Sequence, residues 1–182
     1  QGAVGTVIVD GKKYRKPAPQ KMLWRPDRVT HFYKVAGVNI VEVKFIAKND
    51  VLCSMISADK DIEIEFEGAS FANPGEFPTF DGDKEGQEFT QSVTATARHD
   101  QAKNSIHVVE GGTILTKTAW KETLLGKIMY DGMSVVLSAS QKLQNVTITK
   151  DKVGRQVYKF KLSIPAGKTQ TLTYSQHDSY KV

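Results

Sequence analysis

The sequence predicts an all-β fold, a large antiparallel β-sandwich with one long loop. Three observations support this fold class. Apolar and polar residues alternate with a period of two along most of the chain, as in "DIEIEFEG" at 61–68. Turn signals such as "VDGKK", "YDGM" and "PAGK" recur at short intervals between these segments. Only one short segment has a helical character. Many short strands with frequent turns are typical of a sandwich or a barrel.

The first half of the chain contains the clearest strand patterns. In the segment at 61–68, Ile62, Ile64 and Phe66 alternate with glutamates, which indicates a strand with one face in water. Residues 38–48 and 50–57 are two long strand candidates joined by Lys48-Asn49-Asp50. Asn and Asp tolerate the backbone conformations of a tight turn, so these segments are expected to form a hairpin.

Further strand candidates continue to the end of the chain. They are Val4–Val9, Val29–Lys34, Val93–Arg98, Ser105–Val109, Thr113–Thr118, Ser134–Ser140, Val146–Lys150, Gln156–Ile164 and Thr169–Ser175. In Gln156–Ile164 the residues Tyr158, Phe160, Leu162 and Ile164 share one face, which we expect to pack inward. The segment "TAWKETLLGK" at 118–127 is the helical candidate, a turn or two ending at Gly126.

Length and composition favour one soluble domain over residues 1–182. A chain of 182 residues can bury one sizeable core, and 40% hydrophobic with 25% charged residues is ordinary for a globular domain. Because no apolar run approaches about 18 residues, a membrane span is excluded. The net charge of +5 is modest. The basic cluster "GKKYRK" interleaves charge with an aromatic ring, but no groove-reading helix accompanies it, so nucleic-acid binding is disfavoured against a solvated strand face.

Terminal and cysteine features say little about compartment. Cys53 lies inside the apolar run "VLCSMIS", where a small buried packing group is the expected role. The chain starts with Gln1, so a leader could have been removed or a longer protein cut. A periplasmic or extracellular bacterial location is compatible with this start, and we expect the chain to be the N-terminal part of a longer protein.

The segment from Gly68 to Gln91 differs from the rest of the chain. It contains four glycines, two prolines and four phenylalanines and has little regular periodicity. A connection of this length is usually functional or mobile, and its aromatic content argues against disorder. We expect a structured loop that covers a sheet edge or contacts a partner, with Phe77 and Phe80 as candidate contacts.

Within that loop, "DGDKEG" begins like a calcium loop. Asp81, Asp83 and Glu85 alternate before Gly86, but the twelfth position, where an EF-hand requires a bidentate glutamate, is Ser92. An EF-hand is therefore excluded. A looser calcium site at Asp81 and Asp83 stays open as a minority interpretation, and a solvated acidic turn without any cofactor is preferred.

No catalytic residue can be assigned. The four histidines lie far apart without metal-ligand spacing, and no nucleophile elbow or phosphate-binding glycine motif is present. The glutamates of 61–68 do not differ from ordinary surface acids, so glycosidase chemistry cannot be located. An autonomous enzyme is disfavoured.

The segment "MLWRPDRVTHFYK" contains the candidate binding residues Trp24, Arg25, Asp27 and Arg28. An aromatic platform beside planar hydrogen-bonding groups suits sugar rings and hydroxyls, or a protein interface. The alternative is structural: an arginine pairs with Asp27, and Trp24 covers the edge of the core. The residue pattern favours this alternative.

The run from "VDGKKY" through "IEIEFEGASF", with "GGTILTKTAWKETLLGKIMYDGMSVVLSAS" and "YKFKLSIPAGKTQTLTYSQHDSY", resembles the N-terminal β-sandwich of large bacterial glycosidases. In these enzymes, such as glycoside hydrolase family 63 and other six-hairpin glycosidases, the sandwich precedes an (α/α)6 catalytic barrel. The resemblance covers most of the chain in pattern and implies a supersandwich-like fold. It carries no catalytic residue onto this sequence, because those residues belong to the barrel.

What the resemblance implies about function is a supporting role. We expect a noncatalytic domain of an exported bacterial glycoside hydrolase that packs on the helical catalytic domain of the same polypeptide. The alternative is an independent module that binds an oligosaccharide or a protein through Trp24, Arg25 and the long loop.

Overall fold

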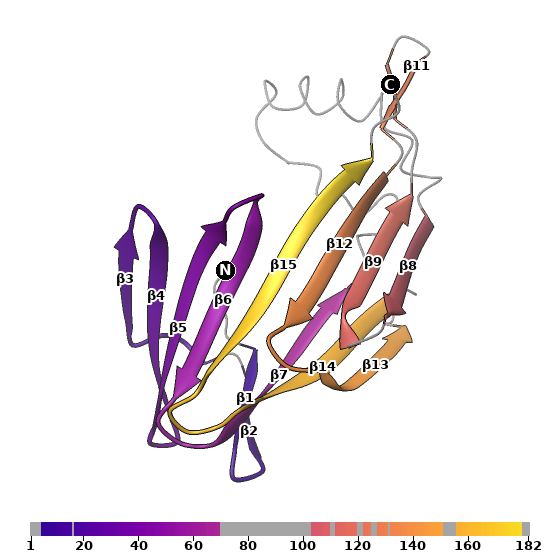
Figure 1. The fold of residues 1–182 in the computed structure, drawn as a ribbon. Coiled ribbons are helices and arrows are strands. Elements are labelled where there is room, and N and C mark those ends of the chain that lie inside the picture. The colour runs from indigo at the N-terminus through magenta and orange to yellow at the C-terminus, as the bar shows by residue number, and fades with distance from the viewer. Residues whose placement is uncertain are drawn as a thin grey trace, which may run out of the picture.

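The computed structural model describes residues 5–15, 17–69, 103–109, 112–119, 122–124, 127–130, 132–150 and 156–179. Within these ranges every regular element is a β-strand (Figure 1). The strands form two large antiparallel sheets and one separate hairpin, so the prediction of an all-β sandwich is confirmed.

The smaller sheet has five strands. Their order is β13 (Gln144–Lys150), β14 (Gln156–Ile164), β7 (Ile62–Ala69), β1 (Thr6–Val9) and β2 (Lys12–Arg15). The outer face of this sheet is the solvent-exposed face that the alternation at 61–68 predicts. There the glutamates of β7 pair with lysines of neighbouring strands: Glu63 with Lys161, Glu65 with Lys13 and Glu67 with Lys159, each at 2.9 Å.

The larger sheet has eight strands. Their order is β3 (Lys21–Arg25), β4 (Arg28–Val35), β5 (Val38–Ala47), β6 (Val51–Ala58), β15 (Thr169–Ser179), β12 (Gly132–Ala139), β9 (Ile114–Ala119) and β8 (Lys103–Val108). The smaller sheet lies behind it in Figure 1, and β14 packs across from β6, β15 and β8. Because eight strands face five, part of the larger sheet extends beyond its partner.

The core lies between the two sheets. Tyr158, Phe160, Leu162 and Ile164 of β14 are all buried there, as predicted. The ring of Phe160 stacks on Phe66 of β7 with 5.1 Å between centroids. From the larger sheet the core receives side chains of β4, β5, β6, β9 and β15: Tyr33, Val35, Val38, Ile40, Ile56, Ala58, Ile114 and Leu172.

The hairpin expected at Lys48-Asn49-Asp50 is confirmed. Strand β5 ends at Ala47, which pairs with Val51 of β6. Asn49 and Asp50 have φ values of 67° and 58°, in the left-handed region that these two residue types tolerate. The pairing runs to Ile40 and Ala58, so this hairpin forms the longest ladder on the β3 side of the sheet.

The helix expected at 118–127 is wrong. Ala119 still belongs to β9, and two short strands follow, β10 (Glu122–Leu124) and β11 (Lys127–Tyr130), which pair with each other. A short apolar run does not distinguish a helical turn from a strand, and here pairing between strands decides the outcome. Four strands were not predicted: β2, β3, β10 and β11.

The boundary predicted for the long loop at Gly68 is wrong. Gly68 and Ala69 belong to β7, where they pair with Tyr158 and Val157 of β14. The rest of that loop, with Phe77, Phe80, Asp81 and Asp83, lies outside the described residues, as does the strand expected at Val93–Arg98.

Candidate functional site

The candidate residues of "MLWRPDR" lie on the hairpin of β3 and β4. Arg25 pairs with Arg28 across the two-residue turn Pro26-Asp27. The side chain of Trp24 is 72% exposed, so it does not cover the edge of the core as the structural alternative assumed. The other half of that alternative agrees with the structure, because Arg28 Nη1 lies 3.7 Å from Asp27 Oδ2. That ion pair is exposed and contributes little to stability.

Strand β3 is the edge of the larger sheet, and all five of its residues are exposed. Met22, Leu23 and Trp24 expose 60%, 41% and 72% of their surface. Successive side chains of a strand point to opposite faces. Trp24 and Met22 therefore lie on one face of the sheet, and Leu23 and Arg25 lie on the other. The sequence predicts Trp24 and Arg25 in one candidate site, but their side chains lie on opposite faces of β3.

Trp24 and Met22 belong to the face of the sheet that contains the core. The ladders place Met22 opposite His31 and His31 opposite Glu42, whereas Trp24 is opposite Val29 and Val29 is opposite Lys44. Paired residues of an antiparallel ladder share one face. The same face continues into the buried layer, where Tyr33 pairs with Ile40.

A second exposed row crosses this face farther along the strands. Ile46 of β5 pairs with Leu52 of β6, and Leu52 pairs with Tyr174 of β15. These side chains are 63%, 37% and 37% exposed. Burial raises the pKa of Tyr174, and it also raises the pKa of Tyr158 in the opposite sheet, with Tyr174 as a second cause. Tyr174 lies two residues from the buried core residue Leu172, on the same face of β15, and is therefore directed toward the smaller sheet.

Together these side chains form an uncovered continuation of the core. We call the group Met22, Trp24, Ile46, Leu52 and Tyr174 the open face. The part of the larger sheet formed by β3 to β6 is called the wing. One end of its inner strands packs on the smaller sheet, and the rest extends beyond it (Figure 1). Exposed apolar side chains grouped on one sheet face are typical of an interaction surface.

A buried polar cluster lies beside the open face, on the same face of the sheet. Glu42 is only 2% exposed and accepts hydrogen bonds from Tyr33 Oη at 2.9 Å and from Ser54 Oγ at 2.8 Å. Lys44 Nζ lies 3.2 Å from Glu42 Oε1. His31 Nδ1 lies 3.8 Å from Glu42 Oε2, and this buried atom has no hydrogen-bond partner among the described residues. A buried carboxylate requires such donors.

This cluster connects β4, β5 and β6, the three inner strands of the wing. The donors Tyr33, Lys44 and Ser54 come from β4, β5 and β6 respectively. The carboxylate of Glu42 therefore holds the three strands in one register. Local alternation could not reveal this, because Glu42 and Lys44 look like ordinary wet-face residues in "VNIVEVKF". The burial of Glu42 depends on pairing across three strands, which a one-dimensional pattern does not contain.

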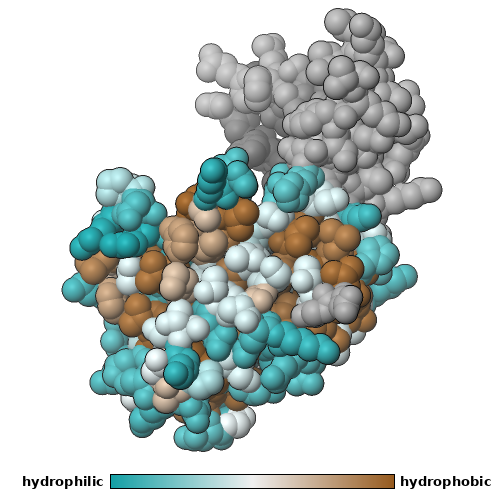
Figure 2. Space-filling view, viewed as in Figure 1, coloured by the Kyte–Doolittle hydropathy of each residue, from teal (hydrophilic) through white to brown (hydrophobic). Residues whose placement is uncertain are grey.

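The opposite face of the wing is also apolar. Leu23, Val43 and Met55 form one row across β3 to β6, through Thr30, and Leu23 and Met55 are 41% and 37% exposed. A neighbouring row contains Phe45 beside Cys53. Cys53 is buried, as expected for a packing group. Figure 2 shows apolar surface on this side of the molecule. Strands that present apolar residues on both faces are usually covered on both.

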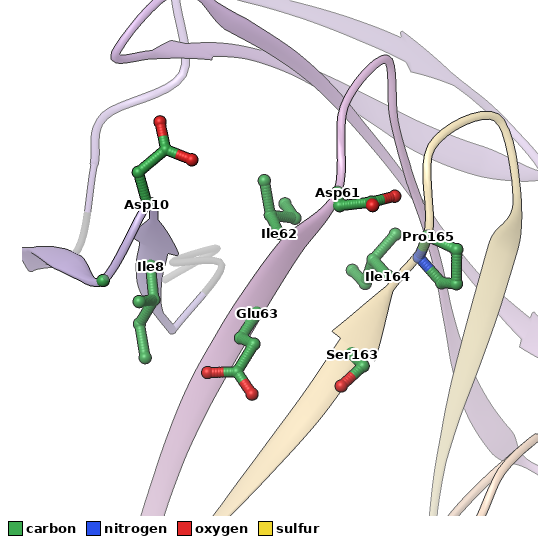
Figure 3. Close-up of a pocket in the computed structure, with 9 residues that line it drawn as sticks. Ile8, Asp10, Asp61, Ile62, Glu63, Ser163, Ile164 and Pro165 are labelled. Carbon is green, nitrogen blue, oxygen red and sulfur yellow. The ribbon is translucent and has the colours of Figure 1, made fainter.

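A separate pocket of about 430 Å3 lies at one end of the smaller sheet. Asp10, Asp61 and Glu63 surround apolar side chains that include Ile62 and Ile164 (Figure 3). Two of the acids have partners: Asp61 accepts a hydrogen bond from the backbone N–H of Ala166, and Glu63 pairs with Lys161. The pocket therefore offers few free groups for a ligand.

Metal ligands do not gather in the described part of the chain. No group of three or more His, Cys, Asp or Glu residues there could hold a metal ion. His107 contacts Ser105, and His31 belongs to the Glu42 cluster. Among the described residues no helix is long and apolar enough to cross a membrane.

Comparisons with known proteins support the fold. No family model and no curated protein matches the sequence. A solved structure described as a kojibiose phosphorylase from the human microbiome superimposes with a TM-score of 0.51 at 11% identity. The match covers 96% of this chain but 22% of that chain.

At this identity the likeness shows a shared fold. This chain spans 22% of the length of the phosphorylase chain, and the match supports the β-sandwich fold. The narrower resemblance to glycoside hydrolase family 63 gains no support, because the neighbour has a different description.

Proposed function

We propose that this chain is a noncatalytic β-sandwich domain of a larger carbohydrate-active protein, and that its wing packs on a separate catalytic domain. The observation that carries the proposal is the exposure of large apolar side chains on both faces of β3 to β6. Covering Met22, Trp24 and Ile46 would remove much apolar surface from water, which is the main driving force for domain association.

The fold comparison agrees with this role. The matching phosphorylase chain is several times longer than the matched part, and its description names an enzyme acting on a disaccharide. The resemblance to six-hairpin glycosidases implies that the catalytic residues of the parent protein would lie outside these 182 residues, in a helical domain. Export to the periplasm or cell exterior belongs to the same proposal and rests on the resemblance to bacterial glycosidases.

Two proteins test the proposal: the parent polypeptide with residues 1–182 and the same polypeptide without them. The shortened protein should keep its catalytic activity, because residues 1–182 contribute no reacting groups. Its melting temperature should be lower, because the catalytic domain has lost a supporting domain. Glycosidase or phosphorylase activity of residues 1–182 alone would contradict the noncatalytic role.

A second candidate function rests on Trp24. Its ring is 72% exposed on an edge strand, where it shares one face of the sheet with the exposed side chain of Met22. An exposed aromatic ring can stack on a sugar ring, so the chain could be an independent glycan-binding module. Calorimetric titration of the isolated chain with oligosaccharides separates the two functions. Measurable affinity that is lost in Trp24→Ala would favour the module.

A further inference from the structure

Strand β3 has a free edge as well as free faces. No described strand pairs with β3 on the side away from β4. In an antiparallel sheet, alternate residues of an edge strand direct their N–H and C=O groups away from the neighbouring strand. Natural sheets usually block such an edge with inward-pointing charges, proline or a bulge. The centre of β3 instead contains Met22, Leu23 and Trp24, all exposed.

The charges of this edge are positive at both ends. Lys21 and Arg25 bound the apolar centre, and Arg28 lies beside Arg25 across the turn. Among the described residues, Asp27 is the only acid that pairs with any of them, and it contacts Arg28 at 3.7 Å. Lys21 lies over the ring of Phe32, with Nζ 5.9 Å from its centroid. Lys21 and Arg25 therefore have no carboxylate partner in the part of the chain that the structure describes.

We infer that β3 accepts an extended segment of the catalytic domain as an additional strand, and that this segment has apolar side chains between acidic flanks. The inference rests on the proposed function and names the contact by which the domains join. Main-chain hydrogen bonds to β3 would provide affinity, and alternate side chains would pack beside Trp24 on one face and Leu23 on the other. Acidic flanks would meet Lys21 and Arg25.

The charge pattern disfavours a second copy of the chain as the occupant. An antiparallel pairing of two β3 strands centred on Leu23 would place Lys21 opposite Arg25 of the other copy, at both ends. Like charges directly opposite one another destabilise a strand pair. A strand with acidic flanks would instead place a carboxylate opposite Lys21 and another opposite Arg25. We therefore infer that the occupant of the edge is such a strand.

Hydrogen–deuterium exchange on the parent polypeptide and on the isolated chain tests the inference. Strand addition predicts that alternate backbone amides of β3 exchange at least about tenfold more slowly in the parent than in the isolated chain. Equal β3 exchange in both, with the open face covered in the parent, would overturn strand addition and leave the proposed function standing. Equal exchange in the two proteins at both β3 and the open face would contradict the inference and the proposed function.

Two other occupants have their own outcomes, and each would overturn the inference. Protection of the β3 amides already present in the monomeric isolated chain would assign the edge to another part of this chain. Protection that depends on the concentration of the isolated chain, together with a dimer in ultracentrifugation, would assign the edge to a second copy.

A pair of charge variants provides an independent measurement. In Lys21→Glu/Arg25→Glu, the association of residues 1–182 with the remaining polypeptide should weaken about tenfold, because two attractive pairs become repulsive. Lys142→Glu/Lys150→Glu is the matched control, since it changes the net charge equally at two exposed lysines in or beside β13 of the smaller sheet. Equal effects of the two variants would show that only net charge matters and would overturn the inference.

Discussion

The hydroxyl of Tyr33 donates a hydrogen bond of 2.9 Å to Oε2 of Glu42, in the buried cluster beside the open face. A carboxylate at this depth is stabilised only while its donors remain in place. The cluster therefore couples the register of β4, β5 and β6 to the shape of the proposed docking surface.

Removing the acceptor should cost more than removing one donor. Glu42→Ala leaves the donors Tyr33, Ser54 and Lys44 without their shared partner, and we expect a loss of about 3 kcal/mol in the free energy of unfolding. Ser54→Ala removes one of several donors and should cost about 1 kcal/mol. Urea denaturation measures both. A smaller loss for Glu42→Ala than for Ser54→Ala would contradict the role assigned to the cluster.

Gly68 of β7 is expected to tolerate no larger side chain. A Cβ at this position would overlap the ring and hydroxyl of Tyr158, which is buried. Gly68→Ala should destabilise the domain by about 1–3 kcal/mol. The double variant Gly68→Ala/Tyr158→Leu provides the control, because Gly68→Ala should cost less once the ring is gone. Additive losses would show that the overlap is relieved elsewhere.

The carboxyl group of Asp59 should contribute to acid sensitivity. The backbone N–H of Asn39 donates to Oδ1 at 2.9 Å and its side-chain amide donates to Oδ2 at 2.6 Å, so the pKa of Asp59 is lowered in the folded protein, chiefly by the backbone donor. A lowered folded-state pKa adds stability above the unfolded value of 3.8, and this stability is lost as the pH falls through the folded pKa.

Denaturation at pH 7 and near pH 3 measures this contribution. Asp59→Ala should lower stability at pH 7 and lose part of the pH dependence between these values. An NMR titration of the Asp59 carboxyl group provides the direct check. A midpoint above 3.8 would contradict the lowered pKa.

Trp24 should matter for association and hardly at all for folding. Because its side chain is 72% exposed, Trp24→Ala should change the unfolding free energy of the isolated chain by less than about 0.5 kcal/mol. Ile40→Ala is a useful contrast, since Ile40 is 1% exposed and should cost about 2–5 kcal/mol. A large loss for Trp24→Ala would mean that the ring is covered within the chain.

Local sequence patterns were sufficient to predict a strand where it has one buried face and one solvent-exposed face. The alternation in 61–68 and in Gln156–Ile164 predicted both the strands and their core faces, and the Asn49-Asp50 turn followed from residue chemistry. Strand β3 was missed because its residues are all exposed, so no alternation marks it. The helix at 118–127 was wrong because pairing between strands outweighed the local preference.

The candidate site was predictable only in part. Trp24 and Arg25 were identified from their residue types, but they lie on opposite faces of β3. The open face combines residues from β3, β5, β6 and β15, which the sequence separates by more than a hundred positions. Glu42 was missed because the local pattern is that of a solvent-exposed strand face. Its burial is recognised only from the hydrogen-bond donors that the fold brings to its carboxylate.

The most direct test of the account is calorimetric titration of residues 1–182 into the separately produced remainder of the parent polypeptide. The account predicts binding that weakens about hundredfold or more in Trp24→Ala/Ile46→Ala, because these two side chains anchor the open face. An absence of binding, or a parent reading frame without a further domain, would contradict the central claim that this sandwich supports a catalytic domain.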